Sequence, residues 1–466
     1  MMSKGKTASL PIDFIVVGAG TAGLAAAFGL SRAGHRVTVL EEYGDSKDTA
    51  GGVRSPPNMT KIIRGRWGLE EEFEKIAFES ENISILNYET GELCGSHRWN
   101  EDLMRQAGGM YNFMHLSDLA NMLADNARFH GAQIRYNEKV VSMTKGSLKA
   151  NIKPSVTLAS GETLTADVIV GADGPDSTVK HFLLGERPVG KPMGLLMWNT
   201  LLPWSALEAD PDLTYFSEQK DNFCTFYGDF HSVVTFPVRG PSGDNFAVHV
   251  FTPDDGTLQD PGRGSWRKQV PTSMLVNAMH KCDPRLVRLV ELGRLPTCVR
   301  MFETPPSEDW GTPDTPVILI SDAAHALFPG AIQHQSMAIE DAACLSEIFT
   351  HLKGHDQIAT FLDAFEEVRR PRIEAIRESE NYTMRFMTMP PGPLRDVRDE
   401  NMRVAREAGK GVFDGEDAYE AVLEVFAYDA IDEATDWWMK WGILKERHIG
   451  RHDEPLDITI QRTVYE

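Results

Sequence analysis

Cysteine, positive charge and long apolar runs are scarce in this chain, and each shortage excludes a class of protein. The 466 residues include five cysteines, which are odd in number, scattered and never in a Cys-x-x-Cys pair. Such usage is typical of reduced core thiols in a reducing compartment, not of a disulfide framework. No stretch approaches the roughly 18 consecutive apolar residues of a membrane span, and residues 1–6 lack the apolar segment of a signal peptide. We therefore expect a soluble, cytoplasmic protein.

Acidic residues outnumber basic ones by 68 to 47, which gives a formal net charge of −21. The resulting field repels phosphate backbones and anionic membrane surfaces, so no nucleic acid is expected as a partner. Any anion that the protein binds then needs local donors, such as the N-terminus of a helix. Hydrophobic residues at 42% and charged residues at 25% describe an ordinary globular chain, which excludes disorder and fibres.

The first ordered unit is a βαβ pattern near the N-terminus. An apolar, β-branched run at 12–17 predicts a strand, alanine and leucine over 24–33 predict a helix, and 36–40 predicts a second strand. The glycine-rich sequence 18–23 separates the first strand from the helix. Strand, glycine turn and helix in this order are typical of a dinucleotide-binding fold.

Residues of this unit have separate physical tasks. Gly18 permits the tight turn, Gly20 lets a pyrophosphate approach the backbone, and Gly23 allows close packing of helix on sheet. Ala22 belongs to the same expected cofactor-binding turn, and the helix N-terminus supplies the positive end of a dipole. Glu41, at the end of the second strand, suits a hydrogen bond to a ribose and favours a free 2′-hydroxyl over a 2′-phosphate.

Two further strands each deliver an aspartate to the edge of the sheet. The run 167–170 leads to Asp173, and the run 317–320 leads to Asp322. Ligands of α/β sheets bind beyond the carboxyl ends of the strands, so both carboxylates are expected at a ligand site. A helix N-terminus is predicted after Asp322, where its dipole would favour an electron-rich group.

The remaining pattern predicts a second lobe and a helical tail. Short alternating runs between about 175 and 301 predict an antiparallel sheet, with strands at 223–227, 232–238 and 246–251. Smaller strands are expected at 133–136, 139–143 and 155–158. Helices are expected at 58–67 with Asn58 as its cap, at 117–129 with Ser117 as its cap, from 345 onward and around 419–426.

In this order and spacing, the three motifs resemble the class A FAD-dependent monooxygenases, the single-component aromatic hydroxylases of the para-hydroxybenzoate and salicylate hydroxylase type. The resemblance covers roughly residues 12–385. It implies an α/β fold in which a Rossmann-like FAD-binding domain is interleaved with an antiparallel-sheet substrate domain, followed by C-terminal helices. The expected boundaries are 8–180 and 311–385 for the FAD-binding domain, 181–310 for the substrate domain and 386–466 for a helical cap.

The same resemblance implies FAD as cofactor and NAD(P)H as co-substrate. The FAD-binding residues that it implies are Gly18, Gly20, Ala22, Gly23, Glu41, Arg54, Asp173, Asp322, Gln333, His334 and Gln335. Several positions depart from the family pattern. Ser321 stands where glycine is usual and Lys180 where arginine is usual, which are mild changes; the arginine usually found after His115 is missing, and His334 stands where glycine is common. The imidazole of His334 would donate to the flavin, restrict its movement, form a covalent link or be tolerated in a widened loop.

The implied reaction is hydroxylation of a phenolic or aromatic acid substrate by O₂ through a C4a-hydroperoxyflavin, with decarboxylation as a variant. The residues assigned to catalysis are Arg54, His231, Pro329 and His334. The residues assigned to the substrate are Phe226, Tyr227, His231 and Phe328. Arg54 is a candidate partner for a substrate carboxylate and His231 a candidate base; no metal ligands are assigned, and the chain is expected as a monomer or homodimer.

Other interpretations stay open on the sequence. The same cofactor machinery would serve an epoxidase or hydroxylase of an alkene, an indole or a terpenoid. A flavin-binding protein without turnover would explain His334 and the missing arginine, and an NAD-dependent dehydrogenase is disfavoured because it leaves the second and third motifs without a role. In the acidic tail, a solvated helix face is expected, with a partner-docking surface around Trp437, Trp438 and Trp441 as the alternative.

Overall fold

A computed structural model describes residues 7–44, 51–185, 190–218, 222–256 and 268–443. Its first sheet has five parallel strands in the order β18-β12-β1-β2-β8. Their bounds are Val317–Leu319, Val168–Gly171, Asp13–Val17, Arg36–Leu40 and Gln133–Arg135. All five predicted strands are confirmed. The three neighbouring strands β1, β12 and β18 are mostly or fully buried apolar runs, as a parallel sheet between helices requires, whereas β8 is a short, partly exposed edge strand.

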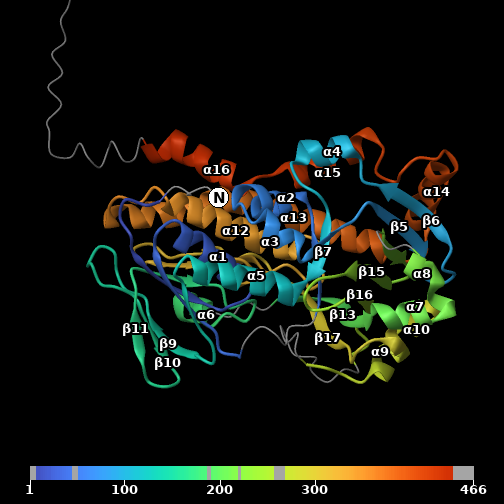
Figure 1. The fold of residues 1–466 in the computed structure, drawn as a ribbon, viewed down its shortest axis with the longest axis horizontal. Coiled ribbons are helices and arrows are strands. Elements are labelled where there is room, and N and C mark those ends of the chain that lie inside the picture. The colour runs from blue at the N-terminus through green and yellow to red at the C-terminus, as the bar shows by residue number, and fades with distance from the viewer. Residues whose placement is uncertain (1–6, 45–50, 186–189, 219–221, 257–267, 444–466) are drawn as a thin grey trace, which may run out of the picture.

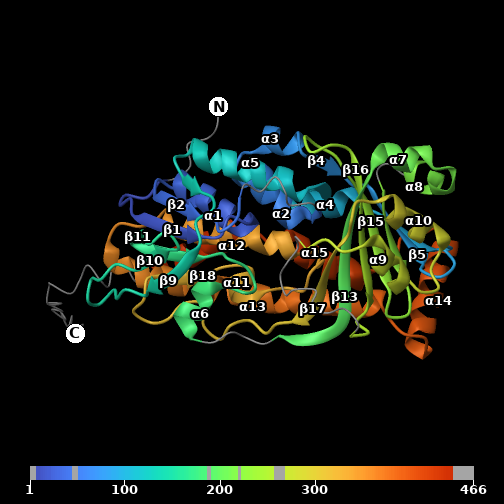
Figure 2. The same ribbon diagram turned by 90° about the horizontal axis from the view of Figure 1, so that it is seen from below.

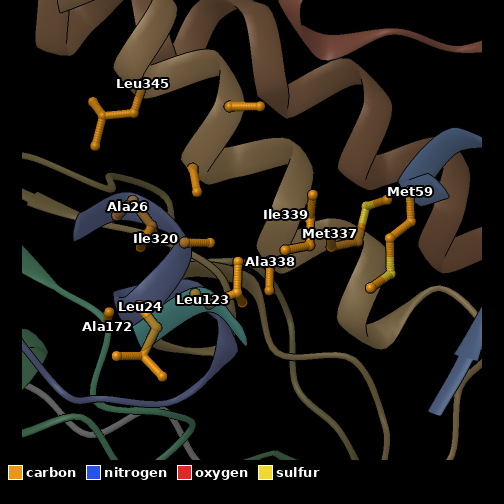
Figure 3. Packing of buried hydrophobic residues seen from close by; sticks show 14 of the residues in the cluster. Leu24, Ala26, Met59, Leu123, Ala172, Ile320, Met337, Ala338, Ile339 and Leu345 are labelled. Carbon is orange, nitrogen blue, oxygen red and sulfur yellow. The ribbon is translucent and has the colours of Figure 1, made fainter. Parts of the chain in front are cut away.

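Helix α1 (Thr21–Arg32) packs on this sheet, and α5 (Leu116–Phe129) and α12 (His334–Phe349) pack against α1. Figure 3 shows residues of the shared buried cluster, with Leu24 and Ala26 from α1 and Ala338 and Ile339 from α12. α1 begins three residues earlier than predicted, since the glycine turn itself leads into the helix.

A small three-stranded sheet lies at one end of the molecule (Figure 1). It consists of β9 (Val140–Thr144), β10 (Ser155–Leu158) and β11 (Thr163–Thr165), and it precedes β12 in the chain. The helix α6 (Thr178–Leu184) follows β12 and contacts β9.

The second lobe contains a seven-stranded sheet in the order β17-β13-β16-β15-β14-β5-β6. Three predicted strands are confirmed as β14 (Asn222–Tyr227), β15 (Ser232–Val238) and β16 (Asn245–Pro253). The other four are β17 (Thr297–Glu303), β13 (Lys191–Pro203), β5 (Asn82–Asn87) and β6 (Leu93–Arg98). All neighbours pair antiparallel except β14 and β5.

The last two strands correct the expected boundary at residue 181. β5 and β6 form a hairpin that pairs with β14, so part of 8–180 belongs to the second sheet. The pairing joins residues more than a hundred positions apart, and no local pattern announces it. The second lobe is therefore built from two separate pieces of the chain.

Short helices cover the outer face of the second sheet, as Figure 2 shows at the far side from α1 and β1. They are α7 (Trp204–Ala209), α8 (Thr214–Glu218), α9 (Thr272–Ala278) and α10 (Pro284–Leu292). The inner face meets a third sheet, in the order β3-β7-β4, with bounds Gly52–Ser55, Asn112–His115 and Ala77–Glu79. The strand β3 begins shortly after residues 45–50, which lie outside the described part of the chain.

Two predicted helix caps are wrong. The helix expected at 58–67 is α2 (Pro57–Lys61), continued by a π-helical turn at Ile62–Arg66. Pro57 takes the first helical position, which suits its missing N–H, and Asn58 therefore lies inside the helix. The side chain of Ser117 makes no cap for α5 either, because it hydrogen-bonds to Ser242.

The last described part of the chain is mainly helical. Its helices are α13 (Ile358–Met387), α14 (Pro393–Glu407), α15 (Glu416–Ala427) and α16 (Ala430–Trp437). Three short helices occur earlier in the sequence, namely α3 (Glu70–Glu74), α4 (Glu101–Ala107) and α11 (Asp322–His325). α15 confirms the helix expected around 419–426. Within the described ranges, no helix combines the length and the apolar character that crossing a bilayer requires.

The tryptophans of the tail do not form the alternative docking surface. Trp437 is buried and donates to Glu367 at 3.2 Å, and Trp438 stacks on His351 with ring centroids 4.1 Å apart. Of the three, Trp441 alone is exposed. The helices therefore use two of their indoles to pack on the main body.

Candidate active site

One cavity of about 260 Å³ runs between the parallel sheet and the inner face of the seven-stranded sheet. One end is lined by the glycine turn, including Gly20 and Ala22, and by backbone at Ala172. The other end is lined by Met197 of β13 and His249 of β16. The cavity thus joins the carboxyl ends of the parallel strands to the second lobe, as the topology of α/β sheets predicts for a ligand site.

The glycine turn leaves space on one side and none on the other. A Cβ at Gly23 would overlap the carbonyl oxygen of Gly18, and Gly18 itself has a φ of 102° with the Ala172 carbonyl against it. A Cβ at Gly20 would meet nothing within 4 Å. Gly18 and Gly23 are therefore required by packing, whereas Gly20 keeps an open approach to the N-terminus of α1.

Glu41 braces the same turn from the end of β2. Its carboxylate accepts hydrogen bonds from the backbone N–H of Ala19 at 2.7 Å and of Tyr43 at 3.0 Å. The side chain is half-buried. Each carboxylate oxygen has a further lone pair, so Glu41 remains able to accept from a ribose hydroxyl.

The carboxylate of Asp173 was expected at the ligand site, but it does not line the cavity. Its carboxylate accepts from the hydroxyl of Ser177 at 2.5 Å and from the backbone N–H of Thr178 at 2.7 Å and of Val179 at 3.1 Å. Burial nevertheless raises the pKa of Asp173, against these hydrogen bonds. The Asp-Gly turn therefore places the carboxylate at the start of α6, and backbone at Ala172 and Gly174 lines the cavity instead.

Asp322 and His334 form a pair in the middle of the cavity. The distance from His334 Nε2 to Asp322 Oδ2 is 2.7 Å, and the side chains are 18% and 23% exposed. Burial opposes the charged imidazole, but the attraction of Asp322 and Glu380 outweighs burial and raises the pKa of His334. His334 begins α12 without a positive φ, so the backbone here accepts a side chain in the usual glycine position.

Glu380 of α13 holds the loop that precedes α12. Its carboxylate accepts from the backbone N–H of Ile332 at 3.0 Å and of Gln333 at 2.8 Å. Burial raises the pKa of Glu380, which is 4% exposed. The side chain of Gln333 points away from the cavity and accepts from Asn58 at 2.8 Å, while Gln335 lines the cavity.

Behind the cavity, a buried ion network joins α12 to α13. Arg369 is fully buried and donates to Glu340 and to Asp341, each at 2.8 Å. Asp341 also accepts from His325 and from the backbone N–H of Ser321, each at 2.7 Å. Burial alone would raise the pKa of Asp341, but His325 and Arg369 outweigh burial and lower it to about 2. The network fixes the backbone next to Asp322.

Arg54 of β3 crosses from the third sheet to the loop before α12. It is 7% exposed, lines the cavity and donates to the carbonyl of Gly330. Pro329, the residue before Gly330, does not line the cavity. Arg54 therefore lies beside the loop that leads into α12.

The structure does not bring the four predicted substrate residues to the cavity. Phe226 packs into the outer cluster with Trp198, because it points to the opposite face of the sheet from the cavity. Tyr227 lies against Phe386 and Arg398, away from the lining residues. Phe328 is buried and lines a separate, small pocket beside Arg377.

His231 is also remote from the lining residues, which corrects its assignment as the base. Its Nδ1 lies 2.6 Å from the carbonyl of Asp229, its Nε2 lies 3.2 Å from the carbonyl of Ala278, and its ring stacks on Tyr88. Both ring nitrogens are thus engaged with backbone, and the residue closes a turn.

The sequence analysis missed Asn199 and His249, which face each other across β13 and β16 and both line the cavity. A signal for His249 was present. It is a histidine at the centre of the otherwise apolar strand segment 246–251, where alternation separates it from the neighbouring valines. A buried polar residue in such a strand needs a partner.

The residues present fit FAD. The open side of Gly20 and the N-terminus of α1 suit a pyrophosphate, and Glu41 suits the adjacent ribose. The cavity continues past Asp322 to a region with Arg54, His249 and apolar walls, where a flat ring system has both apolar surface and hydrogen-bond donors.

Comparisons with known proteins agree with this site. The family model described as "FAD binding domain" matches residues 12–284, more than half of the chain. The chain is 27% identical over 397 residues to the FAD-dependent monooxygenase OpS4 of Beauveria bassiana, covering 84% of this chain and 89% of that protein. It is 26% identical over 422 residues to hispidin-3-hydroxylase of Neonothopanus nambi, covering 84% and 93%.

The fold is also found among solved structures. A salicylate hydroxylase in a substrate complex superposes with a TM-score of 0.70 at 22% identity, covering 91% of this chain and 97% of that one. At this identity the likeness establishes the shared architecture of parallel sheet, second sheet and C-terminal helices.

Proposed function

Because this chain belongs to the FAD-dependent monooxygenases, we propose that it uses NAD(P)H and O₂ to hydroxylate a phenolic or aromatic acid substrate. One observation carries the proposal. A single cavity joins a dinucleotide-binding glycine turn to a buried, apolar region that contains Arg54 and His249. An enzyme of this class needs the cofactor and an aromatic ring in one enclosed space.

The residues at the glycine end bind the cofactor. Backbone N–H groups at Gly20 and the N-terminus of α1 hold the pyrophosphate, and Glu41 accepts from the adenosine ribose. Asp322, hydrogen-bonded to His334, would hold the ribityl chain of the bound cofactor. When bound, FAD supplies hydride acceptance from NAD(P)H and the activation of O₂ for transfer of one oxygen atom.

The residues at the sheet end orient the substrate and exclude water. Met197 supplies apolar surface on the floor, and the loop at Gly330 packs on it, since a Cβ at Gly330 would lie 3.3 Å from the Met197 methyl group. Arg54 provides positive charge beside the ring. An electron-rich ring reacts faster with an electrophilic oxygen when its hydroxyl is deprotonated, so a cation near that oxygen assists the reaction.

The relative that hydroxylates hispidin, by its name, supports a ring-hydroxylated aromatic substrate for this chain. Loss of CO₂ accompanies hydroxylation where the attacked carbon carries a carboxylate.

The test measures NAD(P)H oxidation by the FAD-loaded protein with a panel of phenols, phenolic acids, indoles and prenylated compounds. We expect phenols or phenolic acids to stimulate oxidation, and ¹⁸O₂ to add one labelled oxygen atom to the product. Stimulation by indoles or prenylated compounds alone would refute the aromatic-acid substrate. No stimulation by any member, with FAD bound, would refute turnover and favour a flavin-binding protein.

The matched variants are Arg54→Leu in the cavity and Arg105→Leu on the exposed face of α4. We expect the first to lower the substrate-stimulated rate and the second to leave it unchanged, since Arg105 is 77% exposed and pairs with Asp102 on the surface.

A further inference from the structure

His249 occupies a gap in the cavity floor that two glycine-containing segments define. On the same strand, Ala247 and Phe251 point to the same face as His249. A Cβ at Gly52 would lie 2.7 Å from Ala247, and a Cβ at Gly330 would lie 2.8 Å from Phe251. The strand β3 and the loop before α12 therefore pack on either side of His249, and the imidazole lies between them.

In the described part of the chain, no hydrogen bond accounts for the burial of the imidazole. His249 is 6% exposed, and its Nδ1 is buried without a partner there. Its ring makes an edge contact with Phe236, with centroids 5.2 Å apart. A polar ring buried against aromatic carbon costs stability unless its N–H finds a partner, and a ligand in the cavity that His249 lines can supply one.

Arg54 is the second group at this end without full compensation. Glu380 feels the charge of Arg54, but backbone N–H groups of Ile332 and Gln333 occupy its oxygens. In the described part of the chain, the guanidinium donates to the carbonyl of Gly330 and forms no ion pair. A buried guanidinium with several free donors is suited to an anion.

Burial and the positive charge of Arg54 keep the imidazole of His249 neutral, and a cation beside a neutral donor favours an anionic oxygen. Burial and the charge of Arg54 lower the pKa of His249 to about 3, so the ring is neutral near pH 7. A neutral ring carries one N–H, and an unsatisfied lone pair costs less than an unsatisfied N–H at the buried Nδ1. We assign the proton to Nε2, which makes His249 a neutral donor beside a cation.

We propose that Arg54 and His249 form an oxyanion site that holds the ring-borne anionic oxygen, phenolate or carboxylate, of an aromatic ligand in the cavity. The identification of that ligand as the substrate rests on the proposed function. Asn199 lies opposite His249 on β13 and adds a polar amide to the same floor. Met197 and Phe251 provide the apolar surface for the ring.

The experiment uses the FAD-loaded protein and two probes, 4-nitrophenol and benzoate. Ionised 4-nitrophenol absorbs differently from its neutral form, so difference spectra report the charge of the bound ligand. We expect the wild type to bind it as the phenolate below the pH at which it ionises in water. Benzoate, measured by calorimetry, distinguishes a carboxylate site from a phenolate site.

Arg54→Leu is expected to weaken binding of the preferred anion by about 10-fold or more, since one charged hydrogen bond is lost. His249→Leu is expected to weaken it about 5- to 10-fold, and His249→Gln, whose amide can donate, to recover part of that loss. The control His280→Leu removes an exposed imidazole and is expected to bind like the wild type. Melting temperatures establish that each variant is folded.

Equal anion binding by the wild type and His249→Leu would overturn the assignment. Loss of FAD without loss of anion binding would also overturn it, and would assign Arg54 and His249 to the flavin. A wild type that binds neither probe as an anion refutes the site even if phenols stimulate NAD(P)H oxidation. Conversely, anion binding that depends on both residues supports the site even if turnover fails, so the two failures are distinguishable.

Discussion

Substitution of Gly20 by alanine is expected to weaken FAD binding without unfolding the protein. The backbone at Gly20 is extended, with φ −71° and ψ −178°, which alanine adopts without strain. A Cβ there would meet nothing within 4 Å. The added methyl group therefore projects into space that the protein does not use, on the side where the pyrophosphate approaches.

The expected loss of FAD affinity follows from the hydrogen bonds to phosphate that the added methyl group would break. A methyl group at the approach to the turn displaces the phosphate and costs one or two charge-assisted hydrogen bonds, each contributing about 1.5–3 kcal/mol. The dissociation constant of FAD should rise about 10- to 150-fold for one bond lost. The free energy of unfolding of the apoprotein should change by less than about 1 kcal/mol, because alanine is a poorer helix cap than glycine but also lowers the entropy of the unfolded chain, and the two effects oppose each other.

Gly23→Ala is the matched variant. Its Cβ would overlap the carbonyl oxygen of Gly18, so α1 must shift and the apoprotein itself should lose stability. Flavin fluorescence titration and urea unfolding of both apoproteins separate the two effects. Unchanged FAD affinity in Gly20→Ala would refute the placement of the pyrophosphate at this turn, as would equal destabilisation by the two variants.

Three further predictions concern charged groups. Arg369→Met removes the fully buried cation that Glu340 and Asp341 share, leaving Glu340 with Arg372 and Asp341 with His325, and should cost about 3–5 kcal/mol in urea unfolding at pH 7; a loss below 1 kcal/mol would contradict it. The pKa of Asp341 is lowered from 3.8 to about 2, so its carboxylate adds about 2 kcal/mol to the free energy of unfolding above pH 3.8, and this contribution is lost as the pH falls through 2. Asp341→Asn should make the free energy of unfolding less dependent on pH in this acidic range. The raised pKa of His334 contributes stability below pH 6.5 that is lost as the pH rises through the folded pKa; unfolding of His334→Gly should lack this decline, and a persisting decline would assign it to another group.

The dinucleotide-binding unit was predictable because its information is local. The strand β1, the glycine turn and α1 are consecutive in the sequence, and Gly23 is required by its close contact with Gly18 in the same turn. The same holds for the strands that lead to Asp173 and Asp322. The direction of the Asp173 side chain was not predictable, because Ser177 and the start of α6 compete for its carboxylate.

The substrate end was not predictable because it depends on which face of a sheet a residue occupies. Phe226 and Thr225 are neighbours, yet Thr225 shares the face of Val234 and His249, whereas Phe226 lies with the outer cluster. Strand alternation alone does not say which set is inward when both faces are buried. His231, just outside the strand, was then as plausible as His249.

The charge of the whole chain does not decide what the cavity binds. Fields from exposed charges are screened over about 10 Å at moderate salt, while groups in the cavity act at short range. There, His334 pairs with Asp322, and backbone N–H groups satisfy Glu380. Arg54 is left with a carbonyl and no carboxylate in the described ranges, so the local charge that lacks compensation is positive in a protein whose net charge is −21. An anionic ligand is the partner that completes this balance, and the acidity of the surface bears on how fast it arrives and little on whether it stays.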